Sequence, residues 1–444
     1  MEFKKAIERF FLTESSKKRI ETEPYSAHSQ RKHFHSIKYF DFALEERLWE
    51  RFDFTNEWNN LGYGRISQDD SKWSISNFDI GRDGFSKIIA IVCDEADNFL
   101  CTYAGIKESN GVATLWYNRE VGPIDGVDIA VIEDFLLNYK TGMFESIPVL
   151  SEIPYGYESA VTMRIDCDEH IASGRDLFEL YKKMGVPFSM AIKTSLDFNE
   201  INKKLMLNVI DAGGAIVSHS HTHAPNWGGS RENAMWEAQT ARKRLKEVLP
   251  KKYSYDWVVS PFHQNPTYAL QGLQDAGIKG FIGGIIKNDP EYLLGRAGYV
   301  PYVKNIITHS QQCMLHGDCY HSAGNSIEVY KKSFRNHYKT KTFFGFLDHP
   351  FSNYKYGWTS EEERLLAHKE FLNYIKSFKY IWFANLIDSM NFLWVKANTR
   401  IWIKDGKLEG LLPLHNYNVP DLNLNWKGSS FRISSQSGHN FFLK

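Results

Sequence analysis

The segment VTMRIDCDEH, residues 161–170, ends an apolar, β-rich stretch with two aspartates, Asp166 and Asp168. Residues two apart in an extended chain point to the same face, with Cα atoms roughly 6.5 Å apart. Both carboxylates can therefore converge on one point, whereas Cys167 faces the other way. Two acids on one face of an apolar strand need compensation, which a divalent cation provides. We expect a metal site here, with a solvated strand end as the alternative.

Strands and helices alternate after this segment. The apolar patterning predicts strands over 160–166, 186–192, 215–218, 257–260, 342–347 and 380–384. Helical spacing and helix stop signals predict helices over 174–184, 199–211, 230–249, 266–277 and 361–376. This repeat indicates an α/β fold: a parallel sheet with helices outside, either open or closed into a barrel.

Two other regions flank the repeat. Residues 1–154 mix strand patterns with a helical one at 129–139, which indicates an accessory α/β or α+β domain. After residue 396 the apolar period becomes two, and Asp405-Gly406 is a hairpin signal. We therefore divide the chain into 1–154, a main domain at 155–395 and a small β appendage at 396–444. We expect the appendage to be a packing cap, with a glycan-binding surface as the alternative.

Composition excludes some classes of function. The 444 residues contain 53 Lys plus Arg and 53 Asp plus Glu, so no basic field is available to hold nucleic acid or anionic lipid. The longest apolar run, 88–93, is far shorter than the ~18 residues of a membrane span. The five cysteines are an odd number without a CxxC pair, and charges interrupt the first apolar residues. We expect a cytoplasmic protein without a membrane span or secretion signal.

The second group of polar residues is SHSHTH, residues 218–223, directly after the strand expected at 215–218. The carboxyl ends of parallel strands meet at one edge, so these histidines lie on the side of the two aspartates. Neutral imidazoles with one carboxylate form a common open metal site. If the strand continued, His219, His221 and His223 would share a face. If the chain turned, only His219 and His223 would.

The order of these motifs resembles the polysaccharide deacetylase family, the NodB-homology carbohydrate esterases. The matching residues, within about 155–395, are the aspartates of RIDCDE, then His219, Ser220 and His223, then Pro261 and Phe262, then Leu347 and His349. The resemblance implies a deformed (β/α) barrel. This chain departs from the family pattern where Cys167 separates the aspartates and where Val259 replaces an arginine of the third motif. The family's fourth motif, with its Asp and Trp, has no assigned counterpart.

The resemblance also implies roles for individual residues. It makes Asp166 the catalytic base and His349 the general acid. It assigns metal binding to Asp168, His219 and His223, and substrate binding to Pro261, Phe262 and His263. Two histidines and one aspartate suit zinc, although cobalt, nickel and iron share these ligands.

The function implied is a metal-dependent hydrolase that removes an N-acyl group, in the first instance acetyl, from an amino sugar in glycan or O-antigen precursor metabolism. The expected partner is therefore an amino-sugar or glycan substrate. Two alternatives remain open. One is a catalytically silent glycan-binding or scaffold protein, and the other is a hydrolase of a different C–N bond, such as a formamide or a cyclic amide.

A rival metal site is conceivable in CMLHGDCYH, residues 313–321, which contains two cysteines and two histidines. The segment lacks the ~12-residue separation usual between two pairs of zinc ligands. We expect instead a loop over the carboxyl-terminal face of the barrel, where His316 or Asp318 contacts substrate.

Overall fold

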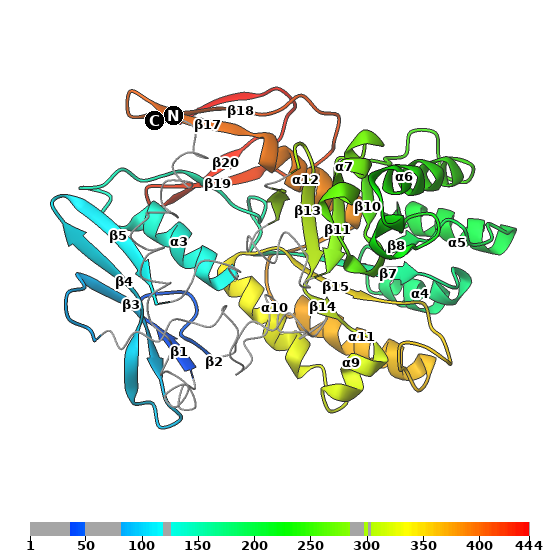
Figure 1. Ribbon diagram of the computed structural model, residues 1–444, viewed down its shortest axis with the longest axis horizontal. Coiled ribbons are helices and arrows are strands. Elements are labelled where there is room, and N and C mark those ends of the chain that lie inside the picture. The colour runs from blue at the N-terminus through cyan, green and yellow to red at the C-terminus, as the bar shows by residue number, and fades with distance from the viewer. Residues whose placement is uncertain (1–35, 49–80, 119–125, 285–296, 301–302, 444) are drawn as a thin grey trace. The chain divides into compact units, whose positions relative to one another are not determined.

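The computed structural model describes residues 36–48, 81–118, 126–284, 297–300 and 303–443 (Figure 1). The chain forms two compact units, Met1–Asp53 with Arg65–Ile124, and Phe54–Gly64 with Asp125–Lys444. Within the described part of the chain, no helix combines the length and apolar character needed to cross a bilayer.

The first unit contains a five-stranded antiparallel sheet in the order β2-β1-β3-β4-β5. Its strands are β1 (Ser36–Tyr39), β2 (Glu46–Leu48), β3 (Lys87–Cys93), β4 (Phe99–Ser109) and β5 (Val112–Tyr117). The β4–β5 hairpin turns at Asn110 and Gly111, whose φ angles of 52° and 75° are those that a two-residue hairpin turn requires.

The second unit is built around a ring of parallel strands. They are β7 (Ser159–Cys167), β8 (Ser189–Ile192), β9 (Ala215–Ser218), β10 (Trp257–Val259), β11 (Gly280–Gly284), β13 (Ile307–Gln311), β14 (Cys313–Met314) and β15 (Phe344–Asp348). Neighbours from β7 to β11 pair in chain order, and β11 then pairs with β13.

One bent segment closes this ring. β14 follows β13 after a single residue, Gln312, whose N–H donates to Gly345 O at 2.9 Å. β14 pairs with β15, and β15 pairs with β7, all in parallel. The strands therefore form a closed but irregular barrel, which confirms the deformed (β/α) barrel expected from the family resemblance.

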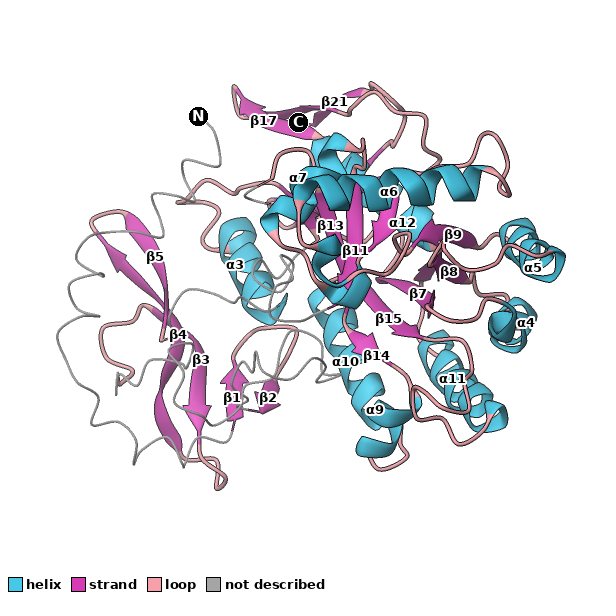
Figure 2. Cartoon of the chain, turned by 45° about the vertical axis from the view of Figure 1, so that its right-hand side comes forward, coloured by secondary structure: helices cyan, strands magenta, loops and turns pink. Residues whose placement is uncertain are grey.

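Shorter strands extend the barrel, and helices cover it. β16 (Ile381–Ala384) pairs with the first half of β7, and β12 (Gly298–Tyr299) pairs antiparallel with β13. Figures 1 and 2 show α4, α5 and α11 outside the strands. Among the described residues the helices are α3 (Gly126–Asn138), α4 (Arg175–Lys183), α5 (Glu200–Asp211), α6 (Arg231–Lys246), α7 (Thr267–Asp275), α9 (Gly317–Ser322), α10 (Glu328–Thr340), α11 (Glu361–Lys376) and α12 (Leu386–Asn398).

Side-chain caps explain where several helices begin. Asn199, Ser230 and Ser360 each accept a hydrogen bond from the backbone N–H three residues later, at the starts of α5, α6 and α11. Such caps satisfy N–H groups that have no partner within the helix. The expected helices accordingly begin within a residue or two of their observed starts.

Strand β7 divides its side chains between two environments. All nine residues are buried. Val161, Met163 and Ile165 belong to the apolar core beneath the helices. Because side chains alternate along a strand, Arg164 and Asp166 project to the opposite side, into the barrel.

The last part of the chain forms two small sheets. One contains β17 (Arg400–Lys404), β18 (Lys407–Leu411) and β21 (Asn440–Leu443), and the other contains β20 (Ser429–Ile433), β19 (Leu422–Trp426) and β6 (Val149–Leu150). Leu424 and Trp426 are buried in an apolar cluster that also includes Met390 and Leu393 of α12. Trp426 Nε1 donates to Ser146 O at 3.1 Å.

Candidate metal centre

The carboxyl ends of β7, β9, β10 and β15 lie at the same edge of the barrel because these strands run parallel. Asp168 follows β7, and His219 and His223 follow β9. The segment Pro261–His263 follows β10, and His349 follows β15. This shared edge gathers residues that are far apart in the sequence.

Three of these residues form a compact group of possible ligands. One ligand atom from each of Asp168, His219 and His223 lies within 4.8 Å of the other two. Asp168 Oδ1 is 3.3 Å from His219 Nε2 and 3.4 Å from His223 Nε2, and the two Nε2 atoms are 3.0 Å apart. Ligands held about 2.0–2.1 Å from a tetrahedral zinc ion lie roughly 3.3 Å from one another, so these separations fit such an ion.

The carboxylate of Asp168 supports the same interpretation. Its Oδ1 is buried, and none of the described residues satisfies it with a hydrogen bond. A buried oxygen without a partner costs free energy of folding. A cation approached by this oxygen and by both imidazoles would remove that cost.

The turn after β9 selects which histidines meet. Ser220 and His223 have φ angles of 61° and 60°, so the chain leaves the extended conformation. The buried carboxylate of Glu237 accepts hydrogen bonds from the N–H groups of His221 and Thr222, at 2.7 and 2.8 Å. The structure thus brings His219 and His223 together.

His221 is directed elsewhere. Its Nδ1 lies 3.0 Å from Thr194 Oγ1, and its ring lies against Trp236 at a centroid separation of 5.4 Å. Of the two arrangements that the sequence leaves open, the turn is the one observed.

Hydrogen bonding orients one of the two imidazoles, and burial keeps the other neutral. His219 Nδ1 lies 3.2 Å from Val259 O, and because a carbonyl only accepts, Nδ1 carries the proton and Nε2 faces Asp168. Burial and His219 lower the pKa of His223 to about 4, so its ring is neutral near pH 7. Burial alone would lower the pKa of His219, but Asp166 and Asp168 raise it above its usual value.

Arg164 is a site residue that sequence reasoning missed. Its Nε and Nη2 donate to the two oxygens of Asp166 at 2.6 and 3.1 Å, and its Nη1 donates to Gly283 O at 3.1 Å. Burial raises the pKa of Asp166, but the charges of Arg164 and His219 outweigh it and bring the pKa to about 2. The available signal was a basic residue two positions before Asp166, on the same face of an apolar strand.

His349 lies near the second carboxylate oxygen of Asp168, Oδ2. Its Nε2 is 3.8 Å from Asp168 Oδ2, and Tyr356 OH donates to the same oxygen at 3.2 Å. Asp348 points away from this group and accepts a hydrogen bond from His368 Nε2 at 3.0 Å. The guanidinium of Arg364 donates to His349 O at 2.6 Å, which fixes the backbone at the end of β15.

The expected substrate-binding segment lies beside the same group. Pro261 is buried, whereas Phe262 is 48% exposed and its ring centroid is 4.4 Å from that of His223. His263 is half-buried, and like Phe262 it has a positive φ. Phe262 therefore offers an open aromatic face next to the possible ligands.

The rival segment at 313–321 does not form a comparable group. His321 Nε2 lies 3.0 Å from Glu363 Oε1, and His316 Nε2 lies 3.8 Å from Cys319 Sγ. Among the described residues, Asp168, His219 and His223 are the one set of three that could share a cation. The ring of His316 does lie near the site, 6.2 Å from the ring of His349.

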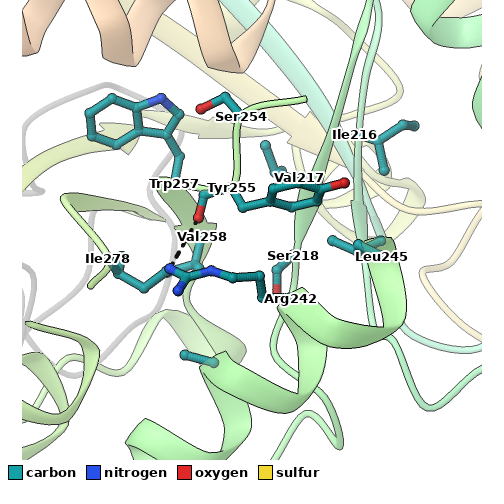
Figure 3. A pocket seen from close by; sticks show the side chains of 11 residues that line it. Ile216, Val217, Ser218, Arg242, Leu245, Ser254, Tyr255, Trp257, Val258 and Ile278 are labelled. Carbon is teal, nitrogen blue, oxygen red and sulfur yellow. Dashed lines mark hydrogen bonds between the residues drawn. The ribbon is translucent and has the colours of Figure 1, made fainter. Parts of the chain in front are cut away.

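A separate small cavity, of about 10 Å³, lies between β9, β10 and α6 (Figure 3). Ser218 Oγ, Arg242 Nε and Tyr255 OH are buried there without a hydrogen-bond partner among the described residues. Figure 3 shows the Tyr255 hydroxyl and the Arg242 guanidinium directed to different ends of the cavity. These polar groups do not converge on a common point, so they do not define a ligand site.

Comparisons with known proteins give similarities to solved structures. No family model matches the sequence, and no curated protein matches it either. A protein from Mycobacterium smegmatis described as a polysaccharide deacetylase has 13% identity and a TM-score of 0.43, covering 54% of this chain and 92% of its own. The PuuE allantoinase has 13% identity and a TM-score of 0.42, covering 56% and 94%.

A third similar structure is a CE4 family pseudoenzyme from Bacillus anthracis. It has 13% identity and a TM-score of 0.36, covering 54% of this chain and 66% of its own. The descriptions of the first and third structures name a polysaccharide deacetylase and the CE4 family, the family that the sequence motifs resemble. The barrel of the present chain is defined by its own strand pairings.

Proposed function

We propose that the protein is a metal-dependent hydrolase that removes an N-acyl group, acetyl in the first instance, from an amino sugar. The observation that carries this proposal is the buried, unsatisfied Asp168 Oδ1 between His219 Nε2 and His223 Nε2. The donor set favours zinc, with cobalt, nickel and iron as alternatives. The order of the motifs along the chain gives independent support.

The residues around this group suit amide hydrolysis. A divalent cation held by Asp168, His219 and His223 would supply Lewis-acid polarisation of the acyl oxygen and would lower the pKa of the attacking water. Asp166 is ionised at neutral pH, because its pKa is about 2, and it accepts the proton of the attacking water. His349 lies on the opposite side of Asp168 and donates a proton to the departing nitrogen.

Substrate binding is proposed for the segment after β10. Pro261, Phe262 and His263 are proposed to line the substrate site, where the exposed ring of Phe262 offers a flat apolar face to a sugar ring. The surrounding metabolism is proposed to be the synthesis of glycan or O-antigen precursors in the cytoplasm. None of the five cysteines, all of which lie in the described part of the chain, forms a disulfide.

A catalytically silent glycan-binding protein is the second candidate. It is favoured by the state of Asp166, since a carboxylate with a pKa of about 2 and both oxygens on Arg164 is a weak proton acceptor. Hydrolysis of a formamide or cyclic amide at the same group is a variant of the first proposal.

One experiment compares these functions. The purified protein is analysed for metal and then incubated with N-acetylated sugars, N-formylated sugars and a cyclic amide, while acetate, formate and ring-opened product are measured. We expect the wild-type protein to release acetate. Asp166→Asn should abolish this release but retain the metal, whereas Asp168→Asn should lose both the activity and the metal. Metal-loaded protein that binds amino-sugar oligomers but releases nothing would support the silent alternative.

A further inference from the structure

We infer that Tyr356 is a positioning residue that sets the geometry of two groups at once, the Asp168 carboxylate through its hydroxyl and the His349 imidazole through its ring. This inference rests on the proposed function, because it gives Asp168 and His349 their roles as metal ligand and general acid. Tyr356 lies in the loop after β15 and matches none of the motifs in the sequence.

The two oxygens of Asp168 have different neighbours. Oδ1 faces His219 and His223, whereas Oδ2 accepts the hydrogen bond from Tyr356 OH at 3.2 Å. A carboxylate can present either oxygen, or both, to a cation. The hydrogen bond from Tyr356 occupies Oδ2 and orients the carboxylate so that Oδ1 faces the two imidazoles. Outer hydrogen bonds of this kind orient metal ligands in proteins.

The ring of Tyr356 acts on His349. The two rings are stacked, with centroids 3.8 Å apart and planes inclined by 6°. His349 Nδ1 is buried, and none of the described residues hydrogen bonds to it. In many sites a hydrogen bond at this nitrogen fixes the imidazole. Here the stacked phenol ring supplies the restraint on ring orientation.

The loop that carries Tyr356 is fastened to its surroundings. Tyr356 O accepts a hydrogen bond from Asp318 N at 3.2 Å, and Lys355 forms an ion pair with Glu169, the residue after Asp168. A Cβ on Gly357 would lie 2.1 Å from Asp318 Oδ1, so the loop packs directly against α9.

The backbone of Tyr356 itself is in an unusual conformation. Its φ of 66° is a left-handed value that bulky residues rarely adopt. Such conformations cost about 1–3 kcal/mol and persist where neighbouring contacts hold them. The loop therefore accepts local strain to place this side chain between Asp168 and His349.

The test separates the hydroxyl from the ring in the full-length protein. Tyr356→Phe keeps the stack and removes the hydrogen bond, and Tyr356→Leu removes both. Cobalt(II) alone is the probe: its dissociation constant is measured by competition with a chelator, and its visible absorption reports the coordination. We expect Tyr356→Phe to weaken cobalt binding by roughly 10- to 100-fold and to change the absorption bands.

The catalytic readout is taken at saturating metal. We expect Tyr356→Phe to lower kcat moderately, because the metal ligand Asp168 is less well oriented. Tyr356→Leu should lower kcat further, with little change in KM, because His349 is then also no longer oriented. Tyr354→Phe is the matched control: its side chain is 95% exposed in the same loop, and neither binding nor kcat should change. Thermal melting of each variant checks that it is folded.

The outcomes distinguish this inference from the proposed function. Cobalt affinity and absorption of Tyr356→Phe equal to those of the wild type would overturn the inference, whatever the enzyme hydrolyses. Weaker binding in Tyr356→Phe from a protein that hydrolyses no amide would uphold the role of the hydroxyl and reject the proposed reaction. A wild-type protein that binds no divalent cation would overturn both.

Discussion

Arg164 and Asp166, two residues apart on β7, form a two-point ion pair inside the barrel, with side-chain exposures of 0% and 2%. Their alternation with Met163 and Ile165 puts both on the inner side of the strand. A buried ion pair contributes little net stability as a whole, but removal of one partner leaves a buried charge without compensation. The pair therefore links the folding of the barrel to the proposed chemistry of Asp166.

The first prediction concerns the cost of breaking this pair. Arg164→Met is expected to lower the free energy of unfolding by about 3–5 kcal/mol, because Asp166 is left charged and buried. The double variant Arg164→Met/Asp166→Asn should recover much of that loss. Urea unfolding of the metal-free single and double variants gives the coupling energy. A loss below ~1 kcal/mol in Arg164→Met would show that the pair is dispensable.

The second prediction concerns acid. The pKa of Asp166 is about 2 in the folded state against its ordinary value of 3.8, so the unfolded chain binds more protons between these values. The stability due to Asp166 is present above about pH 4 and is lost as the pH falls towards 2, by about 2 kcal/mol in total. Asp168, whose pKa is also lowered, acts in the same direction.

Urea unfolding at stepped pH, with chelator present, measures this dependence. The neutral pair Arg164→Met/Asp166→Asn should show a shallower loss of stability below pH 4, with the contribution of Asp168 remaining. Parallel pH profiles for the wild type and the double variant would contradict the depressed pKa.

The third prediction concerns the choice of histidines. His219→Ala and His223→Ala should each lose most of the bound metal, because three protein ligands leave no redundancy in an open site. His221→Ala is the matched control from the same turn, and its metal content should stay at the wild-type level. Elemental analysis of the three purified variants decides. Metal loss in His221→Ala with retention in His219→Ala would mean that the ligands are misassigned.

The fourth prediction separates acid catalysis from positioning at His349. His349→Ala should reduce turnover of an amide by roughly 10²- to 10⁴-fold with metal intact, because expulsion of an amine requires a proton. The reduction should be smaller on an activated ester, whose leaving group departs without protonation. Equal losses on both substrates would point to a positioning role.

The fifth prediction concerns the sheets after α12. Leu424 is fully buried in the apolar cluster with α12, so Leu424→Ala should lower the free energy of unfolding by about 2–5 kcal/mol. Leu414→Ala, at a side chain 84% exposed, should stay within ~0.5 kcal/mol of the wild type. Chemical denaturation gives both values. Metal stoichiometry should be unchanged in both variants, since no candidate ligand lies in this region.

The sequence predicted the elements around the site better than their connections. Periodicity located β7, β9, β10 and β15, because each is an apolar run bounded by turn residues. It could not choose between an open sheet and a barrel. Closure depends on the bend at Gln312, where one short segment changes its pairing partner from β11 to β15. Nothing local in the sequence marks that change.

The same limit applies within the site. Spacing allowed three histidines, and the exclusion of His221 depends on left-handed backbone at Ser220 and on a carboxylate from α6, neither of which the motif contains. Arg164 was missed although alternation along the strand puts it on the face of Asp166, because its burial depends on tertiary packing. Tyr356 reaches Asp168 from a part of the chain 188 residues away. The division of the chain at residues 154 and 395 stays a prediction.

The pairing of β6 with β19 also has a consequence for the order of assembly. Val149 and Leu150 precede the barrel, Leu424 and Asn425 follow it, and Trp426 bonds to a carbonyl 280 residues earlier. Contacts between such distant segments form late, since the intervening chain must first be ordered. During synthesis, the apolar face that β19 covers in the folded protein stays exposed until β19 has emerged from the ribosome. A polar substitution at Leu422 should therefore lower the yield of folded protein in the cell by more than the loss in free energy of unfolding of the variant would suggest.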